Sequence, residues 1–209
     1  MIKRLFIVMM LLLPLATALP AQDKNDPKYL AGAVPLKNGF VIFDKTYKVS
    51  GKSKSELFRA LKAYAETLVK GENSLQQSRI VEDDSVQGLL ALRMEETLYF
   101  RKTAWVTHST RLFYELIFTV GDGQFTVEMR RIHYLYDEGS RGDEPYSFTA
   151  EEWITDEEAL SKDGKKLLRV PGRFRRFTID RKDEIFRGAA RATGAIQKRK
   201  VIQEIEVEE

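Results

Sequence analysis

Few side chains in this sequence could do acid–base or metal chemistry. The chain has no cysteine and only two histidines, His108 and His133, which excludes thiol catalysis and cysteine metal sites. Both histidines fall on the expected core side of a β-hairpin, where His108 opposes Asp137, a pairing that could serve a hydrolase. The alternative is two hydrogen-bonded histidines at the rim of the sheet. Metal binding would need a third ligand that no spacing supplies, so we expect no catalytic residue, no metal and no cofactor.

A second group of side chains is aromatic and basic, the types enriched at binding hot spots. We expect it on the opposite side of the same hairpin. If no other element covers this side, five residues are expected to contact a ligand or partner: Trp105, Arg111, Phe113, Arg130 and Tyr134. The same side is expected to carry Glu115, Ile117, Glu128, Ile132 and Tyr136. The sequence leaves open whether residues 137–177 fold over it instead.

A third group is the basic stretch of residues 165–200. Its densest part holds Arg169, Arg173, Arg175 and Arg176. Such a concentration could contact a polyanion, for example lipid headgroups or acidic glycans. The alternative is a solvated, strongly charged connector.

The hairpin that must position these residues spans Ala104 to Leu135, where apolar residues alternate with polar ones. Asp122-Gly123 suits a two-residue type I′ turn, which fixes the register. In that register the apolar side chains of the two strands lie on the same face, and opposite charges lie across from each other, which supports the register. The pairs that follow are Val120 with Phe125, Glu115 with Arg130, and Phe113 with Ile132.

Helices are indicated in three places. Ser53 with Glu56, and Thr149 with Glu152, form capping boxes that open helices. The first helix carries apolar residues at helical spacing as far as Gly71, and the second is short. A last helix is expected to begin at Asp180, after an irregular or extended stretch over 165–177.

The order strand, helix, antiparallel meander and helix predicts an α+β fold. We expect a two-layer sandwich, with an antiparallel sheet of about five strands and two main helices on one face. The expected organisation is a signal peptide at 1–21, a polar leader at 22–38, one domain at 39–197 and a charged tail at 198–209. The domain includes a loop and short-helix insertion over 137–177.

The N-terminus predicts export. Lys3 and Arg4 precede an apolar run from Leu5 to Leu13, and small residues allow cleavage after Ala21 or, as the weaker alternative, Ala18. Without cysteine the protein is not a lipoprotein, so we expect it free in the periplasm or at the cell surface. Removing the signal lowers the net charge from +3 to about +1, which gives no indication of nucleic-acid binding.

Several segments together resemble a known family. They are the strand Phe40–Val49, the helix from Ser53, the strand through Glu128-Met129-Arg130, and the stretches Ala150–Ile154 and Asp180–Phe186. Over most of residues 38–196 the chain resembles a secreted domain of unknown function with a TATA-binding-protein-like (TBP-like) fold, common in Bacteroides-type bacteria. The resemblance implies a β-α-β4-α sandwich and an envelope location, and it implies no activity.

These observations favour a non-enzymatic binding or interaction module of the cell envelope, with an unknown protein or glycan partner and no nucleic acid. Two alternatives stay open. One is a hydrolase that uses His108 or His133, and the other is association with a polyanion or membrane surface through residues 165–200.

Overall fold

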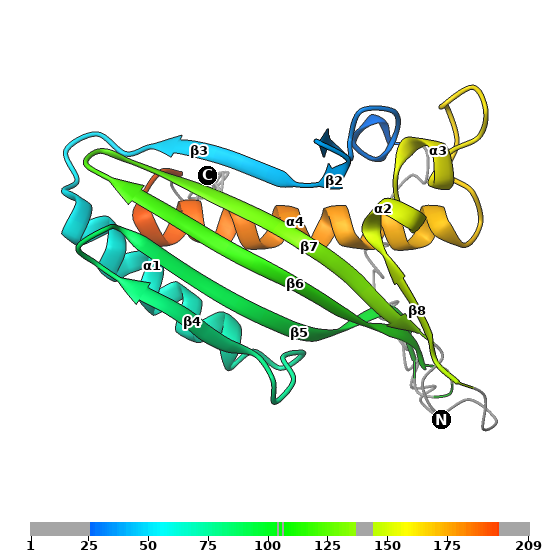
Figure 1. The fold of residues 1–209 in the computed structure, drawn as a ribbon, viewed down its shortest axis with the longest axis horizontal. Helices are drawn as coiled ribbons and strands as arrows, with labels where there is room; N and C mark the ends of the chain where they lie inside the picture. Colours follow the sequence, from blue (N-terminus) through cyan, green and yellow to red (C-terminus); the bar gives the residue numbers. More distant parts are fainter. Residues whose placement is uncertain (1–25, 104, 106, 137–143, 197–209) are drawn as a thin grey trace, which may run out of the picture.

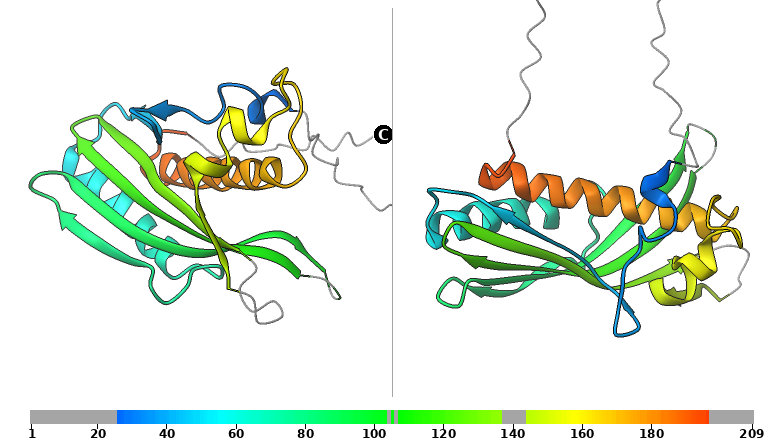
Figure 2. Two further views of the ribbon diagram at one scale, coloured as in Figure 1. Left: turned by 45° about the vertical axis from the view of Figure 1, so that its right-hand side comes forward. Right: turned by 90° about the horizontal axis from the view of Figure 1, so that it is seen from above.

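The computed structural model describes residues 26–103, 105, 107–136 and 144–196. A curved antiparallel sheet forms one layer, and helices α1 and α4 form the other (Figure 1). Seen from above, both helices lie on the same side of the sheet (Figure 2). The helices are η1 (Pro27–Tyr29), α1 (Lys54–Val69), α2 (Ala150–Trp153), α3 (Asp156–Ala159) and α4 (Pro171–Thr193).

The main sheet has six strands in the order β3-β7-β6-β5-β4, with β8 pairing β7 beyond the end of β3. This confirms the predicted α+β sandwich, with β8 as the strand beyond the expected five. The strands are β3 (Phe43–Lys48), β4 (Arg79–Asp84), β5 (Leu89–Lys102), β6 (Thr107–Gly121), β7 (Gln124–Tyr136) and β8 (Tyr146–Thr149). A separate two-stranded ribbon consists of β1 (Leu36–Lys37) and β2 (Phe40–Val41).

The β6–β7 hairpin has the predicted register near its turn and a different one farther away. Glu115 faces Arg130 as expected, but Phe113 faces His133 and not Ile132. The cause is a β-bulge at Arg131, whose backbone φ of 52° lies in the left-handed region. One extra residue in β7 moves every later side chain of that strand to the opposite face.

Helix α1 begins as the sequence predicts. Ser53 and Glu56 form the complete capping box, and the apolar stripe turns its side chains into the core, where Leu61 and Ala65 are fully buried. Helix α1 packs closely against α4 at Gly188, where a Cβ would lie 2.1 Å from the Tyr64 hydroxyl. Burial raises the pKa of Tyr64 to about 12, which keeps the hydroxyl protonated and donating to the Ile185 carbonyl.

Helix α4 begins at Pro171, so the expected irregular stretch over 165–177 is wrong from residue 171 onward, and so is the expected helix start at Asp180. Proline suits the first position of a helix because the N–H that it lacks has no partner there. The early turns bury Phe174, Thr178 and Ile179. Arg175 occupies the same buried side and interrupts the apolar period that would have revealed the helix.

Arg175 joins three parts of the chain beneath α4. Its side chain is fully buried and donates to the carbonyls of Tyr29, Leu30 and Ile154 at 2.6 to 2.8 Å. It also pairs with the carboxylate of Asp156 at 2.7 Å. Burial lowers the pKa of Arg175 while Asp156 opposes that shift. The arrangement fixes η1 and the segment around α2 and α3 to the start of α4.

A second buried ion pair ties α4 to β5. Arg181 contacts both carboxylate oxygens of Glu96, at 2.7 and 2.8 Å, and Glu96 is 2% exposed. Burial by itself lowers the pKa of Arg181, but the hydrogen bonds and charge of Glu96 outweigh it and raise that pKa. The guanidinium therefore stays charged inside the sandwich.

In the described part of the chain, no helix combines the length and apolar character needed to cross a membrane. The predicted signal, residues 1–21, and the predicted tail, residues 198–209, lie outside the described residues.

Candidate functional site

The side of the sheet turned away from α1 and α4, here called the outer face, is open. The segment after β7 packs at one end of the molecule, where the ring of Trp153 of α2 lies against Phe148 of β8 at a tilt and meets Phe174 of α4 edge-on. At the centre of the outer face the side chain of Arg131 is 71% exposed. The described part of the segment expected over residues 137–177 therefore leaves this face uncovered.

The structure places most of the predicted contact residues on the outer face. Arg111, Phe113 and Arg130 lie there, each half-buried among its neighbours. Trp105 precedes β6 and is 94% exposed. These four side chains keep the surface position that the prediction requires.

Tyr134 does not lie on the outer face, and its assignment as a contact residue is wrong. The bulge turns Ile132 and Tyr134 toward the helices, where both are buried. The Tyr134 hydroxyl shares a hydrogen bond of 2.7 Å with the Thr178 hydroxyl, and burial raises the pKa of Tyr134. Tyr136 takes the same side, with its hydroxyl 2.6 Å from Nε2 of His108.

His133 lies opposite Phe113 on the outer face, the place where Ile132 was expected. Its ring is exposed and stacks on Phe113 with centroids 4.4 Å apart and planes 5° from parallel. The sequence does carry a signal for this exchange. From Ile132 onward the even positions of β7 are apolar or aromatic, while Arg131 and His133 are polar.

Charges on the outer face are paired with one another. Glu115 lies between three arginines, with guanidinium nitrogens of Arg131, Arg130 and Arg93 at 3.1, 3.4 and 3.9 Å. Two further pairs flank this group: Arg111 with Glu95 at 3.0 Å, and Arg130 with Glu128 at 3.2 Å. The four guanidinium groups are thus oriented, three carboxylates offset most of their charge, and the group frames the Phe113–His133 stack.

Exposed aromatic side chains gather at one end of the sheet. Trp105 lies between β5 and β6, and Tyr146, which is 61% exposed, opens β8. Pairing of Tyr146 with Tyr136, and of Tyr136 with Thr110, puts β8 beside that end of β6. The aromatic end therefore continues from the same sheet that carries the stack.

The two histidines lie on opposite faces of the sheet. His108 is on the helix side, where its Nδ1 is 2.8 Å from Arg173 of α4 and its ring meets Phe100 edge-on. His133 is on the outer face, so the expectation that both face the core is wrong for His133. The predicted partner of His108, Asp137, lies outside the described residues. Neither ring can assist the other in acid–base chemistry.

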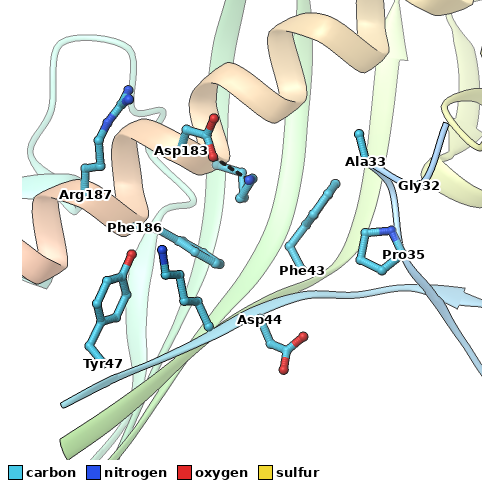
Figure 3. Close-up of a pocket in the computed structure, with 11 residues that line it drawn as sticks. Gly32, Ala33, Pro35, Phe43, Asp44, Tyr47, Asp183, Phe186 and Arg187 are labelled. Atoms are coloured by element: carbon cyan, nitrogen blue, oxygen red, sulfur yellow. Dashed lines mark hydrogen bonds and ion pairs between the residues drawn. The ribbon is translucent and has the colours of Figure 1, made fainter. Parts of the chain in front are cut away.

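A cleft of about 460 Å³ lies between β3, the chain before β1 and α4 (Figure 3). Its walls include the rings of Phe43, Tyr47 and Phe186. Lys182 and Asp183 form an ion pair within it, and Lys37 pairs with Asp44 at 2.6 Å beside it. Both lining carboxylates of this cleft, Asp44 and Asp183, are therefore engaged in ion pairs.

The basic stretch forms a corner around the start of α4. A hollow of about 340 Å³ there is lined by Leu167, Leu168, Arg169, Gly172, Arg173 and Arg176. The expectation that Arg175 joins this surface is wrong, because its side chain is fully buried. The basic surface around the hollow is thus made by the exposed Arg169 and the half-buried Arg173 and Arg176.

Comparisons with known proteins identify relatives by fold and sequence. A family model described as a domain of unknown function (DUF4468) with TBP-like fold matches residues 43–135. The crystal structure of a DUF4468 family protein from Bacteroides ovatus is 34% identical, covers 85% of this chain and 100% of its own, and superposes with a TM-score of 0.75. A TBP-like protein from Parabacteroides distasonis is 21% identical over 78% of this chain and 99% of its own, with a TM-score of 0.62. A comparison with curated proteins finds no match.

Proposed function

The chain belongs to the DUF4468 family of TBP-like domains, and we propose that it is a non-enzymatic binding module of the cell envelope that uses the outer face. The observation that carries the proposal is the stack of the exposed His133 on the half-buried Phe113, framed by arginines that glutamates hold in place. The partner is a protein or a glycan.

Stacked rings suit recognition because they present a large, rigid, amphipathic surface. The side chains of Phe113 and His133 are already ordered by contact with each other, so little conformational entropy is lost when a partner covers them. Arg111 and Arg130 are likewise held by their glutamates. Arginine and aromatic residues together are the usual anchors of protein interfaces.

The pairing of charges favours one kind of partner over another. Three carboxylates, those of Glu95, Glu115 and Glu128, offset most of the charge of the four arginines around the stack, so the face offers no strong potential to a polyanion. Ordered guanidinium and carboxylate groups still offer directional hydrogen bonds at the rim. A polar protein surface or a neutral glycan, which stacks a ring face on aromatic side chains, fits this combination.

The envelope location rests on the N-terminal sequence. Lys3 and Arg4, the apolar run Leu5–Leu13 and the small residues up to Ala21 have the composition of a cleaved secretion signal. The absence of cysteine from the sequence excludes the lipid attachment that would hold a lipoprotein at the membrane. We therefore place the protein free in the periplasm or at the cell surface.

Capture from envelope extracts tests the proposal. The immobilised protein is compared with the double variant Phe113→Ser/His133→Ser, and bound proteins and glycans are quantified. Loss of a hot-spot pair should reduce recovery of the specific partner about tenfold or more. The matched control is Leu36→Ser/Val86→Ser, which removes exposed apolar side chains elsewhere and should leave recovery unchanged. If the double variant retains every partner of the parent protein, the proposal fails.

A further inference from the structure

The corner at the start of α4 differs from the outer face in its charges, because among the described residues none of its basic side chains forms an ion pair. Among the described residues, no carboxylate forms an ion pair with Lys165, Lys166, Arg169, Arg173 or Arg176. Lys165, Lys166 and Arg169 are exposed. Asp163 offsets part of the charge of Lys166. Around the hollow, Arg169, Arg173 and Arg176 have no ion-pair partner among the described residues, which leaves a positive potential there.

Aliphatic side chains lie within the same corner. Leu168 is 41% exposed and Val170 is 45% exposed, and Arg169 stands between them in the chain. Leu167 and Leu168 also line the hollow that Arg169, Arg173 and Arg176 surround. The corner thus presents apolar groups at its tip and cations around them.

The fold holds this corner in position. Leu168 donates its backbone N–H to the Ala159 carbonyl at 2.9 Å, and Leu160 and Leu167 form an isolated antiparallel β-bridge. A Cβ at Gly172 would lie 2.7 Å from the Cβ of Leu167, so the loop packs tightly against the first turn of α4. A rigid tip loses little entropy on docking.

We infer that this corner docks on the surface of an anionic phospholipid membrane. A headgroup phosphate enters the hollow between Arg169 and Arg176, because guanidinium groups bind phosphate with two parallel hydrogen bonds. Leu168 and Val170 enter the boundary between headgroups and acyl chains, and Lys165 and Lys166 remain at the level of the headgroups. The inference is independent of the outer face, which lies on the opposite side of the sheet from α4.

The exposed aliphatic pair distinguishes a membrane from a soluble polyanion. A soluble polyanion would be held by the cations alone and would gain nothing from Leu168 and Val170. A bilayer gains from both, because apolar burial and attraction to anionic lipids add together. The two ligands therefore predict different responses to the same substitution.

Vesicle co-sedimentation tests the inference. The purified protein is mixed with vesicles of phosphatidylcholine alone or with added phosphatidylglycerol, at low and high salt. We expect binding to the anionic vesicles only, weakened by salt. Arg169→Glu/Arg176→Glu should weaken it about tenfold or more, since each basic side chain near a charged membrane contributes substantially. Arg173 is left unchanged because it contacts His108.

Matched variants make the outcome decisive. Lys45→Glu/Lys48→Glu makes the same change of charge on exposed residues of β3 and should bind as the parent does. Leu168→Ser/Val170→Ser should lose binding to vesicles severalfold and keep any binding to dextran sulfate or inorganic phosphate. Circular dichroism confirms that each variant is folded. Absence of binding to anionic vesicles, an equal loss with the β3 control, or full binding by the serine variant would each overturn the inference.

Discussion

The outer face and the α4 corner are both rich in arginine, yet their charges are arranged in opposite ways. On the outer face, Glu115 lies within 4 Å of guanidinium nitrogens from Arg93, Arg130 and Arg131. At the corner, Arg169 and Arg176 have no ion-pair partner among the described residues. The number of arginines in a surface therefore says little about its ligand. The placement of carboxylates decides whether a surface favours a polar partner or an anion.

The largest expected effect is at Arg175, which lies in sequence between the basic residues of the corner but has its side chain buried in the core. Arg175→Met should reduce the free energy of unfolding by about 3–5 kcal/mol, since it leaves buried carbonyls and Asp156 without their donor. Arg176→Met should cost less than about 1 kcal/mol. Urea denaturation measures both. Equal losses for the two variants would contradict the distinction between a structural and a surface arginine.

Removing the central carboxylate of the outer face should make that face resemble the corner. Glu115→Gln releases three arginines, and we expect about a fivefold gain in binding to anionic vesicles, measured in a chain that already carries Arg169→Glu/Arg176→Glu. The stability cost should be about 1 kcal/mol. Glu66→Gln, an exposed change on α1, makes the same change of charge and should produce no gain. A gain shared by both variants would show that net charge matters and pairing does not.

The bulge that builds the outer face can be tested at Arg131. Because its φ is 52°, Arg131→Gly should stay within about 0.5 kcal/mol of the parent, while Arg131→Val should cost about 1–2 kcal/mol. Thermal unfolding measures which of the two variants is more stable. Equal stability of the two would mean that residue 131 does not need the left-handed conformation.

The smallest expected effect concerns Asp163, a carboxylate near the corner that accepts hydrogen bonds from residues of its own turn. Hydrogen bonds from the Ser161 hydroxyl and the Lys165 N–H lower the pKa of Asp163. The unfolded chain therefore takes up this proton first, and the contribution to stability is lost as pH falls from about 4 through the lower folded-state pKa. Asp163→Asn should slightly reduce the loss of stability at acid pH, which urea denaturation midpoints at several pH values would measure. An unchanged slope would contradict the assignment.

Much of the fold follows from local sequence signals. The capping boxes at Ser53 and Thr149 are both present, and the turn at Asp122-Gly123 fixes the pairing of Val120 with Phe125. In these places one or two residues determine the geometry through bonds to their near neighbours. The α+β sandwich with its helices on one face follows from the order of such elements.

The remaining features have weak local signals or depend on distant contacts. Arg131 is not a glycine, so its residue type does not indicate a positive φ, and only the apolar or aromatic residues at 132 and 134 indicate the changed register. Arg175 occupies the buried side of α4 because distant carbonyls of Tyr29 and Ile154 receive it. These two residues account for the misplaced Tyr134 and for the missed first turns of α4.

Photo-crosslinking through the outer face tests the central claim most directly. A benzophenone amino acid replaces Phe113, or Val86 as an exposed control, and the protein is irradiated in the envelope of the bacterium that makes it. We predict one dominant adduct from position 113 that is absent from position 86 and lost when Arg130→Glu is added. The same adducts from both positions, or none from position 113, would contradict a binding role for the outer face.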